Sequence, residues 1–196
     1  MKLSALLAFP LMLAVGEPVL AAPLANPKLK IQTSLGAIEV ELFADKAPVT
    51  VANFLRYVDG GHYKGGQFHR TVTMGNQADK KVKIEVIQGG TNPKGAQKGF
   101  PPVKLERTNK TGLIHKDGTL SMARSAPDTA TSDFFICIGS QPALDYGGKR
   151  NPDGQGFAAF GQVRKGMDVV RKIQQSKAEG QTLRPPIEIL SISRIK

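Results

Sequence analysis

Hydrophobic and polar residues alternate over many short stretches of this chain, which is the period of β-strands. In residues 37–43, for example, Ile38, Val40 and Leu42 are separated by glutamates, so one face is apolar and the other polar. Segments 29–33 and 37–43 flank a Ser-Leu-Gly turn and predict a hairpin. Six further segments have the composition of strands: 67–71, 84–88, 119–123, 134–138, 157–163 and 187–195.

Two segments have the period of a helix instead. Pro48 is suited to begin the first, and Gly60-Gly61 to end it. Its apolar residues fall at i, i+3, i+4 and i+7, and they are Val51, Phe54, Leu55 and Val58. A second, shorter helix is predicted over residues 167–174.

Eight short strands and two helices, with no internal repeat, predict one mainly β domain. A closed barrel or a sandwich with helices over its openings fits this count, and closure leaves no strand edge exposed. The last strand changes its alternation phase at Ile189-Leu190, which predicts a β-bulge. The long glycine-rich connection over residues 89–119 is expected to carry the binding surface.

The first 21 residues have the three-part pattern of a secretory signal peptide: a basic start, an apolar run and small residues at the cleavage point. Gly16-Glu17-Pro18 stops the apolar run well short of the roughly 20 residues that a membrane span needs. We therefore expect export, cleavage after Ala21 and no stable membrane insertion. Residues 22–28 would then form a short extension before a folded domain at 29–196.

The composition excludes several classes of protein and site. With 40% hydrophobic and 22% charged residues, the chain is too apolar to be disordered. Its single cysteine, Cys137, excludes a disulfide framework and a thiolate zinc cluster, and in an exported protein it implies a buried free thiol. The three histidines lack metal-ligand spacing, and the sequence has no P-loop, G-x-G-x-x-G or G-x-S-x-G motif.

The positive signals are five short motifs in a fixed order. They are Phe68-His69-Arg70, Val86-Ile87-Gln88-Gly89-Gly90, Gly118-Thr119-Leu120-Ser121-Met122-Ala123-Arg124, Ser132-Asp133-Phe134-Phe135-Ile136 and Phe157-Ala158-Ala159-Phe160-Gly161. Together with Leu144-Asp145 and the run at 166–170, they resemble the cyclophilin family of peptidyl-prolyl cis–trans isomerases. The resemblance extends from about residue 29 to 195. Met122-Ala123-Arg124 and the predicted signal peptide are most similar to periplasmic bacterial members, so we expect a periplasmic location.

This resemblance implies an eight-stranded antiparallel barrel capped by two helices, with the active site in a shallow groove on its outside. It implies isomerisation of X-Pro bonds in proline-containing polypeptides by a monomer that uses no cofactor and no metal. By the family pattern, Arg70 is the catalytic residue. The implied substrate-binding residues are Phe135, Gln88, Val86, Leu144, Phe157, Ala123 and Arg124, the last through its backbone.

The sequence departs from the family pattern at several positions. Glu85 stands where a phenylalanine of the pocket wall is usual, Asp133 replaces a glutamine beside the groove, and Ala143 lies near a tryptophan position of some members. The glutamate in place of phenylalanine counts against a pocket that excludes water well, and the missing tryptophan counts against tight cyclosporin binding. Glu85 and Asp133 are nevertheless candidate groove residues. Residues 74–83 form an insertion that either narrows substrate choice or is a neutral surface loop; we favour the neutral loop.

Two other functions are open at this level. A cyclophilin-like barrel could capture proline segments as a chaperone with little turnover, an alternative that Glu85 and the insertion favour. The net charge of +11 raises nucleic-acid or anionic-surface binding as the second. Its basic residues are spread along the chain, however, with short clusters only at residues 80–83 and 171–172, so we expect no nucleic-acid partner.

Overall fold

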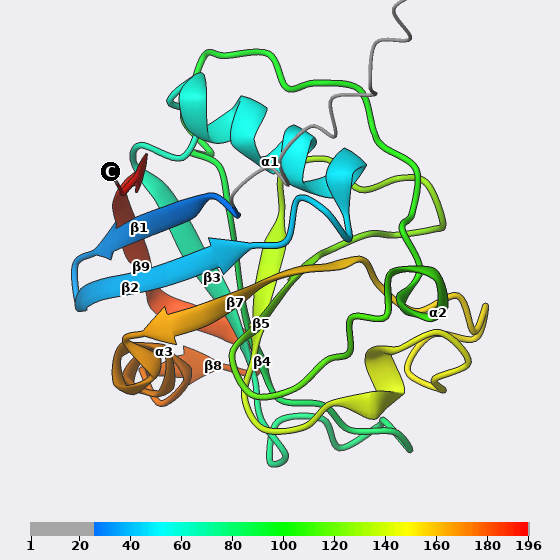
Figure 1. The fold of residues 1–196 in the computed structure, drawn as a ribbon. Coiled ribbons are helices and arrows are strands. Elements are labelled where there is room, and N and C mark those ends of the chain that lie inside the picture. Colours follow the sequence, from blue (N-terminus) through cyan, green and yellow to red (C-terminus); the bar gives the residue numbers. More distant parts are fainter. Residues whose placement is uncertain (1–25, 196) are drawn as a thin grey trace, which may run out of the picture.

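The computed structural model describes residues 26–195 (Figure 1). The predicted signal peptide, 1–21, and most of the predicted extension lie outside the described residues. Within residues 26–195, none of the helices has the length and apolar character that crossing a lipid bilayer requires.

Eight antiparallel strands close into a barrel, as the sequence predicts. The closed order is β1-β2-β7-β5-β6-β4-β3-β9, and β9 returns to pair with β1. The bounds are β1 Lys28–Thr33, β2 Gly36–Leu42, β3 Gly66–Val72, β4 Val86–Gly90, β5 Thr119–Met122, β6 Phe134–Cys137, β7 Ala159–Lys165 and β9 Thr182–Arg194. A ninth strand of two residues, β8 (Ala178–Glu179), pairs only with β9 and lies outside the closed circuit.

Both predicted helices are present, one toward each end of the barrel (Figure 1). Helix α1, Pro48–Asp59, begins at the predicted proline and buries Val51, Phe54 and Val58 in the core. Helix α3, Met167–Gln174, has the predicted bounds and buries Val169, Val170 and Ile173. The apolar stripe of each helix therefore seals the barrel interior from solvent.

Short elements and some strand ends differ from the sequence prediction. Helix α2, Thr108–Thr111, and the 3₁₀ turn η1, Pro142–Leu144, were not predicted because three or four residues are too few to show a period. Strand β9 begins at Thr182, five residues before the predicted start. Pro185-Pro186 obscured this beginning, since proline cannot donate to a sheet ladder.

The predicted bulge in the last strand is confirmed. Gln32 of β1 pairs with Ser191 and Thr33 pairs with Ile189, so Leu190 has no partner in that ladder. Leu190 is exposed, while Ile189 and Ile192 are buried. The extra residue keeps apolar side chains directed into the barrel on both sides of the bulge.

Neighbouring residues of β4 and β6 belong to two different apolar clusters. Ile87, Phe134 and Ile136 face the barrel core, which is filled with aliphatic and aromatic side chains. Val86, Phe135 and Cys137, one position out of phase, pack in a second, smaller cluster on the outer face. A sheet with one wet face would carry polar residues there, so this outer cluster marks a specialised surface.

Candidate functional site

A row of side chains crosses four adjacent strands on the outer face of the barrel. Arg70 of β3 pairs with Gln88 of β4, Gln88 pairs with Phe135 of β6, and Phe135 pairs with Ser121 of β5. Residues in register on neighbouring strands have side chains on the same face of a sheet. Strand pairing thus brings together a cation, an amide, an aromatic ring and a hydroxyl that lie far apart in the sequence.

A β-bulge directs Arg70 to this outer face. Phe68 pairs with Gly89 and Arg70 with Gln88, so His69 is an extra residue in β3. Simple alternation from the buried Phe68 would direct Arg70 toward the core. The bulge reverses the phase, so that Arg70 and Val72 face outward while Thr71 is buried on the inner side.

The row lies in a groove with a volume of about 410 Å³. Its apolar side is the outer cluster: Ile84, Val86, Phe135 and Leu144, with Phe157 packed edge-on to Phe135 at 5.4 Å between ring centroids. Its polar side is formed by basic and amide side chains. The lining residues are Arg70, Lys80, Ile84, Val86, Gln88, Ala123, Arg124, Phe135, Leu144, Arg150, Asn151, Pro152 and Phe157.

Eight of the ten residues named from the sequence lie in this groove. They are Arg70, Gln88, Val86, Phe135, Leu144, Phe157, Ala123 and Arg124. Glu85 and Asp133 are not among the lining residues. Glu85, the residue before β4, accepts a hydrogen bond from Gln174 of α3 at 3.3 Å. Asp133 lies beyond Gln88, whose amide donates to it at 3.4 Å, and beside His69.

The guanidinium of Arg70 is held by two glutamines. Its Nη1 donates to Gln88 Oε1 at 2.9 Å, and its Nε and Nη2 donate to Gln181 Oε1 at 2.9 and 2.6 Å. Both partners are neutral. Burial, with a smaller contribution from the charge of Arg150, lowers the pKa of Arg70. The three bonds leave one N–H on Nη1 and one on Nη2 for a ligand in the groove.

Gln181 was missed by sequence reasoning. It lies in the tight turn between β8 and β9, and its own amide donates to the Asn76 carbonyl at 3.1 Å. No motif singles out a lone glutamine after a glycine. Only the pairing of β3 with β9, where Arg70 is opposite Thr182, brings it to the arginine.

The side chain of Arg124 is engaged within the protein and is not free to bind a ligand. Its guanidinium forms two hydrogen bonds with Asp153, donates to the Gly156 carbonyl, and lies 4.9 Å from the ring centroid of Phe157. The side chain is 1% exposed. This contact secures Phe157 at the edge of the groove. Because the side chain is buried, the part of Arg124 that reaches the groove surface is its backbone.

A hydrogen-bonded chain supports Phe135 from beneath. Asp145 Oδ1 lies 2.7 Å from His115 Nδ1, and His115 Nε2 lies 2.9 Å from Ser121 Oγ. A carboxylate only accepts, so Nδ1 donates to Asp145, and Nε2 is left to hydrogen-bond the Ser121 hydroxyl. The imidazole stacks on Phe135 at 6.0 Å with the rings 17° apart. Ser121 and His115 are completely or almost completely buried, so the chain acts as a support and not as a nucleophile.

The insertion at 74–83 belongs to the groove, contrary to our interpretation of it as a neutral surface loop. Lys80 lines the groove, and the Asn76 carbonyl holds the glutamine that positions Arg70. Arg150 fastens the insertion from the other side by donating to Gln77 Oε1 at 2.8 Å and to the Val82 carbonyl at 2.7 Å. The connection over residues 89–119, which we expected to carry the binding surface, contributes no lining residue to this groove.

Among residues 26–195, no three or more His, Cys, Asp and Glu side chains gather as they would around a metal ion. Cys137 is buried, and burial raises the pKa of its thiol far above the usual range. The groove therefore offers hydrogen-bond donors, positive charge and an apolar notch as its chemical resources.

Comparisons with known proteins converge on one family. The family described as "Cyclophilin type peptidyl-prolyl cis-trans isomerase/CLD" matches residues 28–194. A peptidyl-prolyl cis-trans isomerase of Acinetobacter baylyi is 40% identical over 162 residues, which cover 81% of this chain and 77% of that protein. Peptidyl-prolyl cis-trans isomerase A of Dickeya dadantii is 40% identical over 170 residues, covering 86% and 82% respectively.

Solved structures are similar in fold. A cyclophilin type peptidyl-prolyl cis-trans isomerase of Cryptosporidium parvum superimposes with a TM-score of 0.71 at 23% identity, over 87% of this chain and 98% of the other. The same protein solved in the presence of the dipeptide Ala-Pro gives a TM-score of 0.70 at 24% identity, over 86% and 99%.

Proposed function

The chain belongs to the cyclophilin-type peptidyl-prolyl cis–trans isomerases, and from this premise we propose that Arg70 catalyses the isomerisation in the groove. The enzyme is a peptidyl-prolyl cis–trans isomerase. The finer assignment concerns which of its residues act on the X-Pro bond and which polypeptides it serves.

The X-Pro bond resists rotation because amide resonance gives its C–N bond partial double-bond character, with a barrier of about 20 kcal/mol. At the twisted transition state the prolyl nitrogen becomes pyramidal and regains a lone pair. An arginine N–H can donate to that lone pair, which the planar ground state does not offer. The hydrogen bond from the arginine is therefore stronger in the transition state than in the ground state, which is the condition for catalysis.

The required reduction of the rotation barrier is larger than one hydrogen bond supplies, so both sides of the groove must contribute. Raising the rate from roughly 10⁻² to 10²–10³ per second requires lowering the barrier by about 5.5–7 kcal/mol. A hydrogen bond from a charged donor supplies about 1.5–3 kcal/mol. We assign the remainder to the notch of Phe135, Leu144 and Val86, which would hold the proline ring while the preceding carbonyl rotates, and to desolvation of the amide.

One observation carries this assignment: Arg70 keeps two unused N–H donors in the same groove as the apolar notch. Gln88, next to Arg70 in the row, would bind the substrate backbone, and the backbone at Ala123 and Arg124 would pair with the bound peptide as a short strand. The Cryptosporidium parvum protein solved with Ala-Pro supports a proline-containing ligand by family analogy.

We further propose that the substrates are exported proteins folding in the periplasm. The support is the signal-peptide pattern of residues 1–21. Fractionation of cells expressing the full chain tests it: a shortened protein in the periplasmic fraction is expected, and a full-length protein retained in the cytoplasm would refute export.

The test of the site is proline isomerisation of a short neutral peptide by wild type and three variants. Arg70→Ala should lose most of kcat while peptide binding is largely retained, and Phe135→Ala should lose binding as well. The control Arg171→Ala removes an arginine that is 46% exposed on α3 and outside the groove, and it should keep wild-type kcat/KM.

The same assay tests the alternative of a chaperone that binds proline segments with little turnover. That alternative predicts an inactive wild type that still binds peptide. The structure removes one of its arguments, because Glu85 hydrogen-bonds Gln174 and does not enter the groove.

A further inference from the structure

The polar side of the groove is formed by positive charge without counter-charge. Four basic residues line the groove, and no acidic residue does. Arg124 is neutralised by its paired bonds to Asp153. The other three, Arg70, Lys80 and Arg150, form what we call the cationic rim, and within the described chain none of them has a carboxylate within ion-pair distance.

Arg150 distinguishes the rim from the generally basic surface of the protein. An exposed lysine is well hydrated and needs no partner. Arg150 is partly buried, and this burial lowers the pKa of its guanidinium. Its Nη1 donates to the neutral Gln77 Oε1 and Val82 carbonyl, and in residues 26–195 its Nε and Nη2 make no hydrogen bond. A partly desolvated guanidinium with a free edge is a binding site for a carboxylate.

Lys80 adds an exposed charge to the same wall. Its side chain is exposed, and in the described chain it makes neither a hydrogen bond nor an ion pair. The two groove segments that carry Lys80 and Arg150, the insertion and the loop after η1, are joined by the bonds of Arg150 to Gln77 and Val82. The rim is therefore a built part of the groove wall and not a chance grouping of surface side chains.

We propose that Arg150 and Lys80 bind an acidic side chain of the substrate, so that the enzyme prefers prolyl peptides with Asp or Glu close to the proline. This inference rests on the proposed function, since it names the substrate class of the same groove. Arg70, whose remaining N–H groups the proposed function assigns to the prolyl nitrogen, contributes only its positive charge to the rim.

The test compares blocked five-residue peptides, acetylated and amidated, that carry Glu or its neutral isostere Gln two residues before or two residues after the proline. Isomerisation is measured by NMR exchange as kcat/KM. For wild type at low ionic strength we expect the Glu peptide to exceed the Gln peptide by about three- to tenfold at one of the two positions. The ratio should decline toward one when salt shortens the Debye length to about 3 Å.

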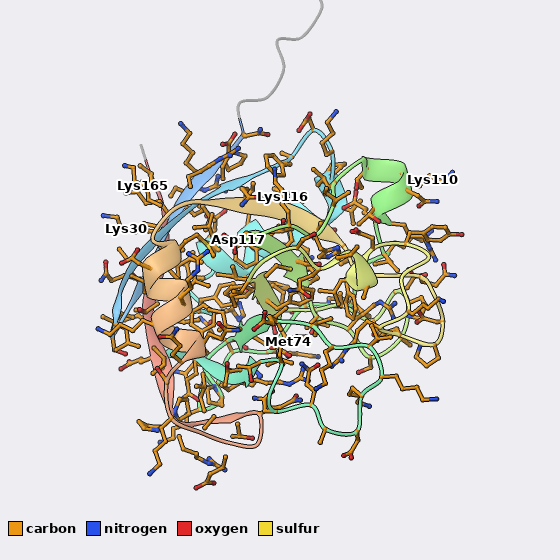
Figure 2. The ribbon with its side chains drawn as sticks, turned by 90° about the horizontal axis from the view of Figure 1, so that it is seen from below. Lys30, Met74, Lys110, Lys116, Asp117 and Lys165 are labelled. Carbon is orange, nitrogen blue, oxygen red and sulfur yellow. The ribbon has the colours of Figure 1, made fainter. Side chains whose placement is uncertain are left out.

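Three variants assign the preference to the rim. Lys80→Gln removes one charge without removing a bond and should lower the Glu/Gln ratio, and Lys80→Gln/Arg150→Gln should bring it to about one. Lys30→Gln is the matched control: Lys30 is exposed on β1, which is four strands from β6 in either direction around the barrel (Figure 2). It makes the same charge change and should keep the wild-type ratio.

The outcomes separate this inference from the proposed function. Turnover of the Gln peptides by wild type establishes the isomerase independently of any preference. A wild-type Glu/Gln ratio of one at both positions would overturn the inference, and so would a ratio that survives in the double variant. If Lys30→Gln lowers the ratio as much as Lys80→Gln, overall charge is responsible and the rim assignment is wrong. Should the double variant fail to fold, the comparison of Lys80→Gln with Lys30→Gln still decides whether the rim causes the preference.

Discussion

Gln181 allows the positioning of Arg70 to be tested apart from its charge. Replacing Gln181 by alanine removes the acceptor of two hydrogen bonds, from Nε at 2.9 Å and from Nη2 at 2.6 Å, and leaves the bond from Nη1 to Gln88. The arginine keeps its charge and its place on the bulge of β3. What changes is the freedom of the guanidinium to rotate about its remaining contact.

A hydrogen bond to a charged group contributes about 1.5–3 kcal/mol, and water replaces part of it at a half-buried site. We therefore take the lower end, about 1.5 kcal/mol, which corresponds to roughly a tenfold loss of kcat/KM. The loss should fall on kcat more than on KM, because Arg70 acts on the lone pair that only the twisted bond offers.

The assay is proline isomerisation by Gln181→Ala, Arg70→Ala and the double variant, with circular dichroism to check the fold. If Gln181 acts through Arg70, the double variant loses no more than Arg70→Ala alone. Gln181→Glu keeps an acceptor oxygen for Arg70 but loses the donor to the Asn76 carbonyl, so it should retain more activity than Gln181→Ala if the acceptor is what positions the guanidinium. A double variant whose losses multiply would show that Gln181 acts elsewhere, for example through its bond to the Asn76 carbonyl, and would refute the positioning role.

Three further predictions concern the fold. Leu190→Lys should cost under about 0.5 kcal/mol because the bulge leaves Leu190 exposed, whereas Ile189→Lys, one residue earlier and fully buried, should unfold the barrel; urea titration compares them. Cys137 should react with a thiol reagent only as the protein unfolds, because burial raises the pKa of its thiol; the denaturant midpoint of its reaction should equal the midpoint of unfolding. The hydrogen bond from Arg194 lowers the pKa of Asp59, so the Asp59 carboxylate stabilises the fold above its unfolded pKa of about 3.9, and this contribution is lost as the pH falls through the lower folded pKa. Asp59→Asn should therefore reduce the melting temperature at pH 7, and the reduction should shrink as the pH is lowered below the unfolded pKa.

The sequence predicted the strands and helices well because their periods extend over enough residues to be recognised. The helix at 167–174 has the predicted bounds, and even the bulge at residue 190 was visible as a change of phase. The bulge at His69 was not predicted. A three-residue stretch of apolar, polar and basic side chains fits either phase, and only the pairing with β4 shows which one is adopted.

The groove was predicted only in part, because some of its residues lie in recognisable motifs and others do not. Family motifs supplied Arg70, Gln88 and Phe135, because those residues lie within recognisable runs. Gln181 and Arg150 lie in loops, and their roles depend on which strands become neighbours when the barrel closes. The pairing of β3 with both β4 and β9 is a long-range property, so local sequence patterns do not contain it.

The chain Asp145–His115–Ser121 shows why access as well as geometry decides what a site can do. Its two distances, 2.7 and 2.9 Å, would serve a serine hydrolase. Here Ser121 has no exposed surface, and the Phe135 ring stacked on His115 covers the chain from the groove side. A hydroxyl that no carbonyl can approach does not act as a nucleophile, however well its proton is positioned. The same two bonds instead satisfy buried polar atoms and fix the imidazole on which the Phe135 ring is stacked. Polar residues beneath an apolar notch thus give the notch rigidity without making it polar.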